Sequence, residues 1–217
     1  MDAKVSAGSL TILVYLSENV PRSIIGSVFV ERSENLYIIM TSVETARLLL
    51  RMFRPDDLDS LTALVADRDV MRYVGHGQPA SREEADAALK SIIRHWETHG
   101  FGRWAAIDKA TQSFVGFGGL RSLLGTPEVV YHLAKTHWGR GLATELARAS
   151  LRYGFEEHRF DQIVAIAKPE NVASIHVMEK VGMHYDKYTS YYDINVVQYE
   201  IKQAEFAADD SPYLLQP

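Results

Sequence analysis

The sequence predicts a mixed α+β fold, with a mostly antiparallel sheet of about seven strands, one parallel crossover and about four flanking helices. Short links join three consecutive strand-like runs, and short links favour an antiparallel meander. A strand, a helix and a strand then follow one another over residues 128–167, which is the order of a parallel crossover unit. The runs of the meander are 102–108, 113–121 and 128–134.

Residues 1–43 differ from the rest of the chain, and we expect an N-terminal extension that is either β-prone or disordered. Met40 is an alternative start of translation, which would leave residues 1–39 as a segment without chemistry. Polar and turn-forming residues separate its three β-prone runs, which are 10–16, 24–30 and 36–40.

The first of these runs is not expected to be a secretory signal. Only Lys4 precedes it as a basic residue, Asp2 offsets that charge, and no small-residue cleavage pattern follows. The chain has no stretch of about 18 consecutive apolar residues, so we also expect no membrane span.

The main domain is expected over residues 44–204, and its first strand is the alternating run at 47–54. Pro55-Asp56-Asp57 ends this strand and caps a helix that reaches about residue 66. This helix is the first of the two that precede the meander.

A capping box marks the start of the second helix. The Ser81 side chain is placed to accept a hydrogen bond from the Glu84 amide, while the Glu84 side chain reaches back to the Ser81 amide. The helix is expected to run to about His99 and to end at Gly100.

A helix, a strand, a second helix and a pair of strands follow the meander. Gly182 closes the second of these helices at its C′ position. Residues 205–217 are expected to form a loose C-terminal tail. The ranges of these elements are 141–158, 162–167, 172–181, 184–192 and 194–202.

Composition limits the function classes. The chain has 217 residues, no cysteine and a formal net charge of −5. An acidic chain is not typical of a nucleic-acid-binding protein, and the lack of cysteine excludes disulfides, thiolate metal sites and a cysteine nucleophile. We therefore expect one sizeable cytoplasmic domain with neither nucleic acid nor a membrane as its partner.

A glycine-rich turn lies between the meander and the next helix. Gly139-Arg140-Gly141 stands where the first amides of a helix lack intrahelical partners and the helix dipole adds positive partial charge. Glycine lets the backbone approach a pyrophosphate closely, and Arg140 is able to add a bidentate contact. With Lys135 and His137 nearby, the turn predicts a phosphate-binding site.

Two other interpretations of this turn stay open. Gly-x-Gly also occurs in tight connections without a ligand, and Gly139, Gly141 and Thr144 half-match the dinucleotide pattern G-x-G-x-x-G. The meander before the turn and the lack of a series of βαβ units argue against a dinucleotide fold, and no Walker A lysine motif occurs.

The stretch Trp138-Gly139-Arg140-Gly141-Leu142-Ala143-Thr144-Glu145 resembles the acetyl-CoA pyrophosphate motif of the GNAT superfamily. The family pattern is Q/R-x-x-G-x-G/A, in which Gly141 and Ala143 take the small positions and Trp138 takes the first. With tryptophan at the first position, the motif resembles that of the ribosomal-protein N-terminal (Rim-type) acetyltransferase subgroup. Further stretches similar to that subgroup are 44–51, 115–119 and 171–183, and the resemblance spans about residues 44–202.

This resemblance implies a GNAT-like sheet, acetyl-CoA as the acyl donor and N-acetyltransferase activity. It implies that a backbone N–H around Leu133 polarises the thioester carbonyl, and that pantetheine pairs with a strand edge where 128–134 and 162–167 splay apart. The expected cofactor-binding residues are Leu133, Ala134, Arg140, Gly141, Ala143, Thr144, Asn171 and Ser174.

Ser174 is the candidate for stabilising the departing CoA thiolate, because it lies one turn into its helix on the face that Asn171 shares. An alternative role for Ser174 is to cap the helix, and the two roles are compatible. Many GNAT members carry a tyrosine four residues further on, where this chain has Met178, which does not donate a useful proton. Tyr131 and Tyr185 are remote substitutes.

Acetyl transfer to an amine also needs a base, because a free alkylamine has a pKa above neutrality. Glu128, at the start of its strand, is the candidate base and would act through water; the alternative is a solvent-exposed strand-end carboxylate. His132 lies on the same strand face and is a second candidate. His76 falls where GNAT members line the acceptor site, and it is expected to bind the acceptor. His132, on the face of Glu128, is the second expected acceptor-binding residue.

His95 and His99 have the i, i+4 spacing of a metal-binding pair. Two ligands alone do not make a good site, and the residues between them do not complete an H-E-x-x-H motif. We therefore expect a solvated helix face and no metal.

The predicted function is acetyl-CoA-dependent transfer of an acetyl group to a primary amine by direct attack. The acceptor is either a protein N-terminus or a small-molecule amine. Two alternatives remain: a non-catalytic acyl-CoA-binding or interaction module, which Met178 leaves open, and a nucleotide-dependent oxidoreductase. The β-prone N-terminus is compatible with a homodimer formed by strand addition.

Overall fold

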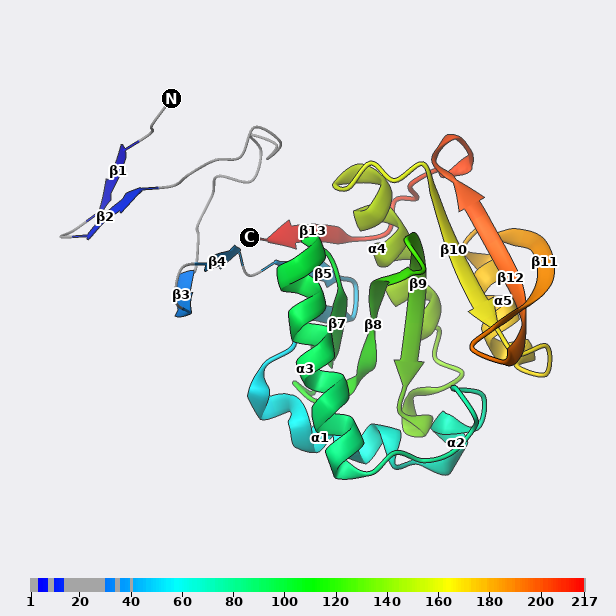
Figure 1. Ribbon diagram of the computed structural model, residues 1–217. Coiled ribbons are helices and arrows are strands. Elements are labelled where there is room, and N and C mark those ends of the chain that lie inside the picture. The colour runs from blue at the N-terminus through cyan, green and yellow to red at the C-terminus, as the bar shows by residue number, and fades with distance from the viewer. Residues whose placement is uncertain (1–3, 8–9, 14–29, 34–35, 40, 217) are drawn as a thin grey trace. The chain divides into compact units, whose positions relative to one another are not determined.

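The computed structural model describes residues 4–7, 10–13, 30–33, 36–39 and 41–216 (Figure 1). The chain divides into two compact units after residue 40, three residues before the expected boundary. In the first unit, two separate pairs of strands are antiparallel. They are β1 (Lys4–Ala7) with β2 (Leu10–Leu13), and β3 (Val30–Ser33) with β4 (Leu36–Ile39). Most of the expected strand at 24–30 lies outside the described residues.

The second unit is built on a nine-stranded sheet, and the predicted fold class is confirmed. The strand order is β11-β12-β10-β9-β8-β7-β6-β5-β13, and β9 with β10 is the one parallel pair among otherwise antiparallel neighbours. The strands are β5 (Ser42–Thr45), β6 (Leu48–Met52), β7 (Arg103–Asp108), β8 (Phe114–Leu123), β9 (Thr126–Leu133), β10 (Gln162–Ala167), β11 (His184–Tyr191), β12 (Ile194–Lys202) and β13 (Tyr213–Gln216).

The two strands beyond the predicted seven are β5 and β13, which pair with each other at one end of the sheet. Residues 205–217, expected as a loose tail, thus contain a strand. Asp209 forms an ion pair with Arg148 at 3.2 Å, and the Arg152 guanidinium lies 4.5 Å from the centre of the Tyr213 ring. A four-residue edge strand carries too little alternation to be recognised in a sequence.

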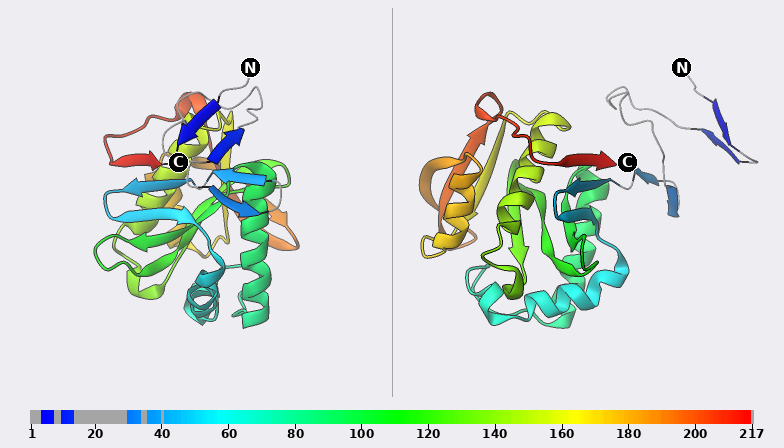
Figure 2. Two further views of the ribbon diagram at one scale, coloured as in Figure 1. Left: turned by 90° about the vertical axis from the view of Figure 1, so that its left-hand side faces the viewer. Right: turned by 180° about the vertical axis from the view of Figure 1, so that it is seen from behind.

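Helices cover both faces of the sheet. Figures 1 and 2 show α1 and α3 on one face and α4 and α5 on the other. The four-residue helix α2 was not predicted; Asp67 caps it by accepting a hydrogen bond from the Asp69 amide at 2.8 Å. Within the described residues, no helix has the length and apolar character that crossing a membrane requires. The helices are α1 (Leu58–Val65), α2 (Arg68–Met71), α3 (Arg82–His99), α4 (Leu142–Glu156) and α5 (Val172–Lys180).

The close approach of α4 to β8 fixes the height of the helix above the sheet. A Cβ atom on Gly118 would overlap both the Leu146 side chain on α4 and the Val130 carbonyl on β9. Leu142 and Leu146 are at most 1% exposed, so the first two turns of α4 pack directly on the sheet. The N-terminus of α4 is therefore held rigidly beside the end of β9.

The predicted capping box of α3 is confirmed. The Ser81 hydroxyl accepts from the Glu84 amide at 3.2 Å, and the Glu84 carboxylate accepts from the Ser81 amide at 2.7 Å. Gly100 ends the helix in the left-handed region, with φ 72°. Both ends of this helix were thus set by local sequence signals.

We expect Ser81→Ala to lower the free energy of unfolding by about 1 kcal/mol, because the Glu84 amide loses its acceptor at an orphan position of the helix. Urea unfolding followed by circular dichroism measures the change. Ser91→Ala is the matched control, since Ser91 is exposed in the middle of the same helix and alanine has the higher helix propensity. Equal destabilisation by the two variants would contradict the capping role.

Candidate functional site

The turn between β9 and α4 presents backbone amides at a helix N-terminus. Gly141 is the N-cap residue of α4, with φ 75°, in the left-handed region that glycine adopts without strain. The first amide that bonds within the helix is that of Glu145, which donates to the Gly141 carbonyl at 3.1 Å. Among the described residues, the amides of 142–144 find no acceptor. Free amides at a helix N-terminus are groups that commonly bind anions in proteins.

An ion pair ties this turn to the chain between β5 and β6. Arg47 Nη2 lies 2.6 Å from Glu145 Oε2, and Arg47 Nη1 donates to the Arg140 carbonyl at 2.7 Å. Glu145 Oε1 also accepts from the Thr45 hydroxyl at 2.6 Å. The sequence did not predict the contact between Arg47 and Glu145, because the two residues lie 98 positions apart. No local sequence pattern around either residue indicates the other as its partner.

Trp138 links the same turn to β9. Its indole N–H donates to the Leu133 carbonyl at 2.7 Å, while 47% of the residue stays exposed. The Arg140 side chain is 52% exposed, and its Nη2 lies 3.9 Å from Asp108 Oδ2. The Arg140 side chain is therefore at the surface of the turn.

The C-terminal half of β9 has an open edge. Although β9 and β10 are eight and six residues long, they pair at one position only, Val164 with Glu128. Figure 1 shows the two strands diverging from there toward their C-terminal ends. The Ala134 amide, just beyond the end of β9, donates to the Val115 carbonyl of β8. Because amides alternate along a strand, the N–H groups of residues 129, 131 and 133 point away from β8. The strands therefore splay as expected, and the Leu133 N–H faces the opening.

Two hydroxyl groups meet beside this opening. The Tyr131 hydroxyl donates to the Ser174 carbonyl at 3.0 Å and lies 3.0 Å from the Ser174 hydroxyl. Tyr131 is therefore not the remote residue that we expected. The side chain that caps α5 is that of Asn171, which accepts from the Ser174 amide at 3.3 Å, so the hydroxyl of Ser174 is not needed as a cap.

Glu128 is buried and paired. It is 2% exposed, which rules out a solvated strand-end carboxylate, and its Oε2 lies 2.6 Å from Arg121 Nε. Burial raises the pKa of Glu128 above its ordinary value, while the charge and hydrogen bond of Arg121 oppose the rise. Arg103 adds a second buried cation nearby, and its own burial lowers the pKa of Arg103 to about 10.

His132 extends this cluster along the same face of β9. Its ring stacks on Phe117 with the ring centres 4.7 Å apart, and its buried Nδ1 has no hydrogen-bond partner among the described residues. Burial, reinforced by the positive charges of Arg103 and Arg121, lowers the pKa of His132 to about 4. The ring is therefore neutral at pH 7 and is able to accept a hydrogen bond.

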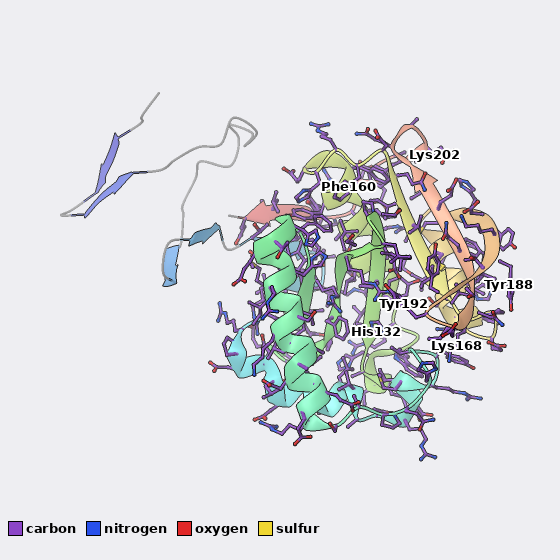
Figure 3. All side chains as sticks on the ribbon, in the orientation of Figure 1. His132, Phe160, Lys168, Tyr188, Tyr192 and Lys202 are labelled. Carbon is purple, nitrogen blue, oxygen red and sulfur yellow. The ribbon has the colours of Figure 1, made fainter. Side chains whose placement is uncertain are left out.

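A pocket of about 410 Å³ lies between the loop that carries His76 and the turn between β11 and β12. Figure 3 shows Lys168, Tyr192 and His132 at this same end of the sheet, where β9 and β10 diverge. Of the two expected acceptor residues, His76 lines the pocket and His132 does not. The other polar side chains in its lining are those of Lys168, Glu170, Tyr188, Asp193 and Asn195.

A second hollow, of about 530 Å³, begins beside the turn at Gly141 and Thr144. It continues along α4 beneath the C-terminal segment, and its basic lining residues include Arg148 and Lys180. Space beside the turn is therefore available for a group larger than a phosphate.

His95, the first histidine of the pair on α3, is half-buried and not on a solvated face as expected, and it has no free lone pair to offer a metal. His95 Nε2 accepts from the Ser122 amide at 3.1 Å, so Nδ1 carries the proton that is donated to the Phe101 carbonyl at 2.8 Å. The His99 ring stacks on His95 with the centres 4.2 Å apart. In the part of the chain that the structure describes, no group of three or more metal-ligating side chains is placed to hold an ion.

Known proteins share this sequence and architecture. Residues 47–184 match the family described as acetyltransferase (GNAT) domain. The uncharacterized protein YkkB of Bacillus subtilis is 34% identical over 75% of this chain and 96% of its own length. The FsC-acetyl coenzyme A-N(2)-transacetylase of Aspergillus fumigatus is 27% identical, over 79% of this chain and 80% of its own.

The fold comparison agrees with the sequence comparison. The crystal structure of a GNAT-family acetyltransferase from Bacillus anthracis superposes with a TM-score of 0.67 and 26% identity, over 76% of this chain and 99% of that one. The matched residues include the turn, the splayed strands and the start of α5. This chain therefore belongs to the GNAT acetyltransferase family.

Proposed function

We propose that this chain transfers the acetyl group of acetyl-CoA to a primary amine, by direct attack of the amine on the thioester carbonyl. The observation that carries the proposal is the free amides of residues 142–144 beside an open strand edge that ends at Leu133. The free amides suit a pyrophosphate, and the open strand edge suits the extended amide chain of pantetheine. The name of the A. fumigatus relative, an acetyl coenzyme A transacetylase, supports the same donor.

The residues around the turn and the splay fit this donor. In our proposal the α4 amides and Arg140 hold the pyrophosphate, and Gly141 leaves room for it because it has no side chain. The Leu133 N–H faces the opening and polarises the acetyl carbonyl. The proposed donor-binding residues are Leu133, Ala134, Arg140, Gly141, Ala143, Thr144, Asn171 and Ser174.

Two side chains would move the protons. We assign the base to Glu128, acting through water, since burial raises its pKa in the direction that a general base requires. We assign Ser174 to the departing sulphur, because its half-buried hydroxyl lies beside the opening between β9 and β10. In our proposal Glu128, on β9, removes the proton of the amine, and Ser174, on α5, donates a proton to the departing sulphur.

The acceptor would enter through the 410 Å³ pocket, whose size is typical of small-ligand sites. The exposed carboxylates of Glu170 and Asp193 outnumber the one lysine of the lining, Lys168, so the excess negative charge attracts a protonated amine. His76 contributes to the wall of the pocket. His132 lies outside the lining of the pocket, and in our proposal it would accept a hydrogen bond from an amine that has passed beyond the pocket. Both a small amine and a protein N-terminus satisfy these contacts, and the Rim-type resemblance favours testing the latter.

The test is release of CoA from acetyl-CoA with a panel of amines and N-terminal peptides, with acetylated products identified by mass. We expect turnover with at least one acceptor, and we expect Glu128→Gln to lower kcat about 100-fold. Glu97→Gln, on the exposed face of α3, is the matched control and should leave kcat unchanged. Acetyl-CoA binding without turnover on any acceptor would favour a non-catalytic acyl-CoA-binding module instead.

A further inference from the structure

Tyr131 and Ser174 form an isolated pair of hydroxyl groups. Both residues are half-buried, and their side-chain oxygens are 3.0 Å apart. In the described residues, Tyr131 is the only hydrogen-bond partner of the Ser174 hydroxyl. A serine hydroxyl rotates freely about its C–O bond, so the partner decides where its proton points.

The pair lies on the open part of β9. Tyr131 is three residues beyond Glu128, the only residue of β9 that pairs with β10, and its side chain reaches across to α5. The next turn of α5 brings Met178, which is 1% exposed and has no proton to donate. The Tyr131 phenol is therefore the protic side chain that backs Ser174 at this position.

The phenol keeps its proton under ordinary conditions. Burial raises the pKa of Tyr131 well above its usual value, and the hydrogen bond to Ser174 only partly opposes this rise. The one proton of the phenol is donated either to the Ser174 carbonyl or to the Ser174 hydroxyl, since both oxygens lie 3.0 Å from it. When the phenol donates to the hydroxyl, it engages a lone pair of the serine oxygen and the serine proton is directed away from Tyr131.

We infer that Tyr131 is a positioning residue for cleavage of the thioester, because its phenol turns the Ser174 proton toward the sulphur of CoA. As the amine nitrogen forms its bond to the acetyl carbon, the carbon–sulphur bond breaks and sulphur keeps the electron pair. Sulphur takes the Ser174 proton, Ser174 takes the Tyr131 proton, and Tyr131 regains one from solvent. Solvent has received the proton that the amine released, so charge and atoms balance. This inference rests on the proposed function.

The thiol pKa of CoA bound to the protein tests the inference without any acceptor. It is read from the ultraviolet absorbance of the thiolate, as the difference from the same protein holding desulfo-CoA; the chain has no cysteine to interfere. We expect Tyr131→Phe and Ser174→Ala each to raise this pKa by about one unit, because the thiolate loses a hydrogen-bond donor. Tyr153→Phe is the matched control: it removes a buried phenol that donates to the Gly100 carbonyl, and should leave the thiol pKa unchanged.

Turnover gives the second readout. We expect Tyr131→Phe to lower kcat roughly 10- to 100-fold while the affinity for acetyl-CoA stays within about twofold, since only proton donation is lost. Adding Ser174→Ala should cost little more, because the two residues act in one chain. An unchanged thiol pKa in Tyr131→Phe would overturn the inference even if the wild-type protein is active. If the two variants raise the thiol pKa of bound CoA as expected but the wild-type protein acetylates no acceptor, the proposed function alone would be overturned.

Discussion

Gly141→Asp is expected to lower the affinity for acetyl-CoA by about 100-fold or more. The new carboxylate would stand at the N-cap of α4, where its oxygens compete for the free amides of residues 142–144. It would also repel the pyrophosphate at short range, where like charges interact most strongly. The substitution therefore fills the anion site with an anion that belongs to the protein.

Gly141→Asn separates charge from shape. Gly141 has φ 75°, and asparagine is the non-glycine residue that best tolerates this region, so both variants carry a similar backbone cost. The nearest atom to a new Cβ is Arg47 Nη2 at 3.5 Å, an ordinary contact. Calorimetric titration should show that the Gly141→Asn variant binds acetyl-CoA at least about ten times more tightly than the Gly141→Asp variant. Equal affinities would mean that the turn does not hold the pyrophosphate.

Arg121→Met is expected to destabilise the fold by about 3 kcal/mol or more, because it leaves a buried charge without its partner. Glu128 is 2% exposed and its shortest ion pair is the 2.6 Å contact with Arg121. Arg103 is near enough to lower the pKa of Glu128, but it forms no hydrogen bond with it among the described residues. Urea unfolding at pH 7 measures the loss.

The double variant Arg121→Met with Glu128→Met should recover most of that stability, since no buried charge remains. In the single variant the pKa of Glu128 rises further, so the folded state holds the proton more tightly than the unfolded chain. Its stability deficit is therefore largest above the folded pKa of Glu128 and shrinks as the pH falls through that value. A deficit independent of pH, or one that persists in the double variant, would contradict this account.

Local signals made much of the fold predictable. The capping box at Ser81, the glycine that ends α3 at Gly100 and the short links of the meander each act within a few residues, and each was confirmed. The turn at 139–144 was recognisable for the same reason, since it combines a strand end, two glycines and a helix start. Periodicity and capping describe such segments well because their causes are local.

Contacts between distant segments were not predictable from these signals. Arg47 meets Glu145, β13 pairs with β5, and Tyr131 meets Ser174 only because the sheet brings them together. Burial was misjudged in a similar way. The position of Glu128 near a strand end is typical of a solvated carboxylate. In the structure Glu128 pairs with Arg121 and is covered by neighbouring elements, so it is only 2% exposed.

Calorimetric titration of the wild-type chain with acetyl-CoA tests the central claim most directly. The free α4 amides and the open edge of β9 predict one bound molecule per chain, with a dissociation constant of roughly micromolar order. Nicotinamide dinucleotides, titrated in parallel, should bind far more weakly. If acetyl-CoA gave no saturable binding at millimolar concentration, the turn at Gly141 would be a tight connection without a ligand, and the proposed function would fall.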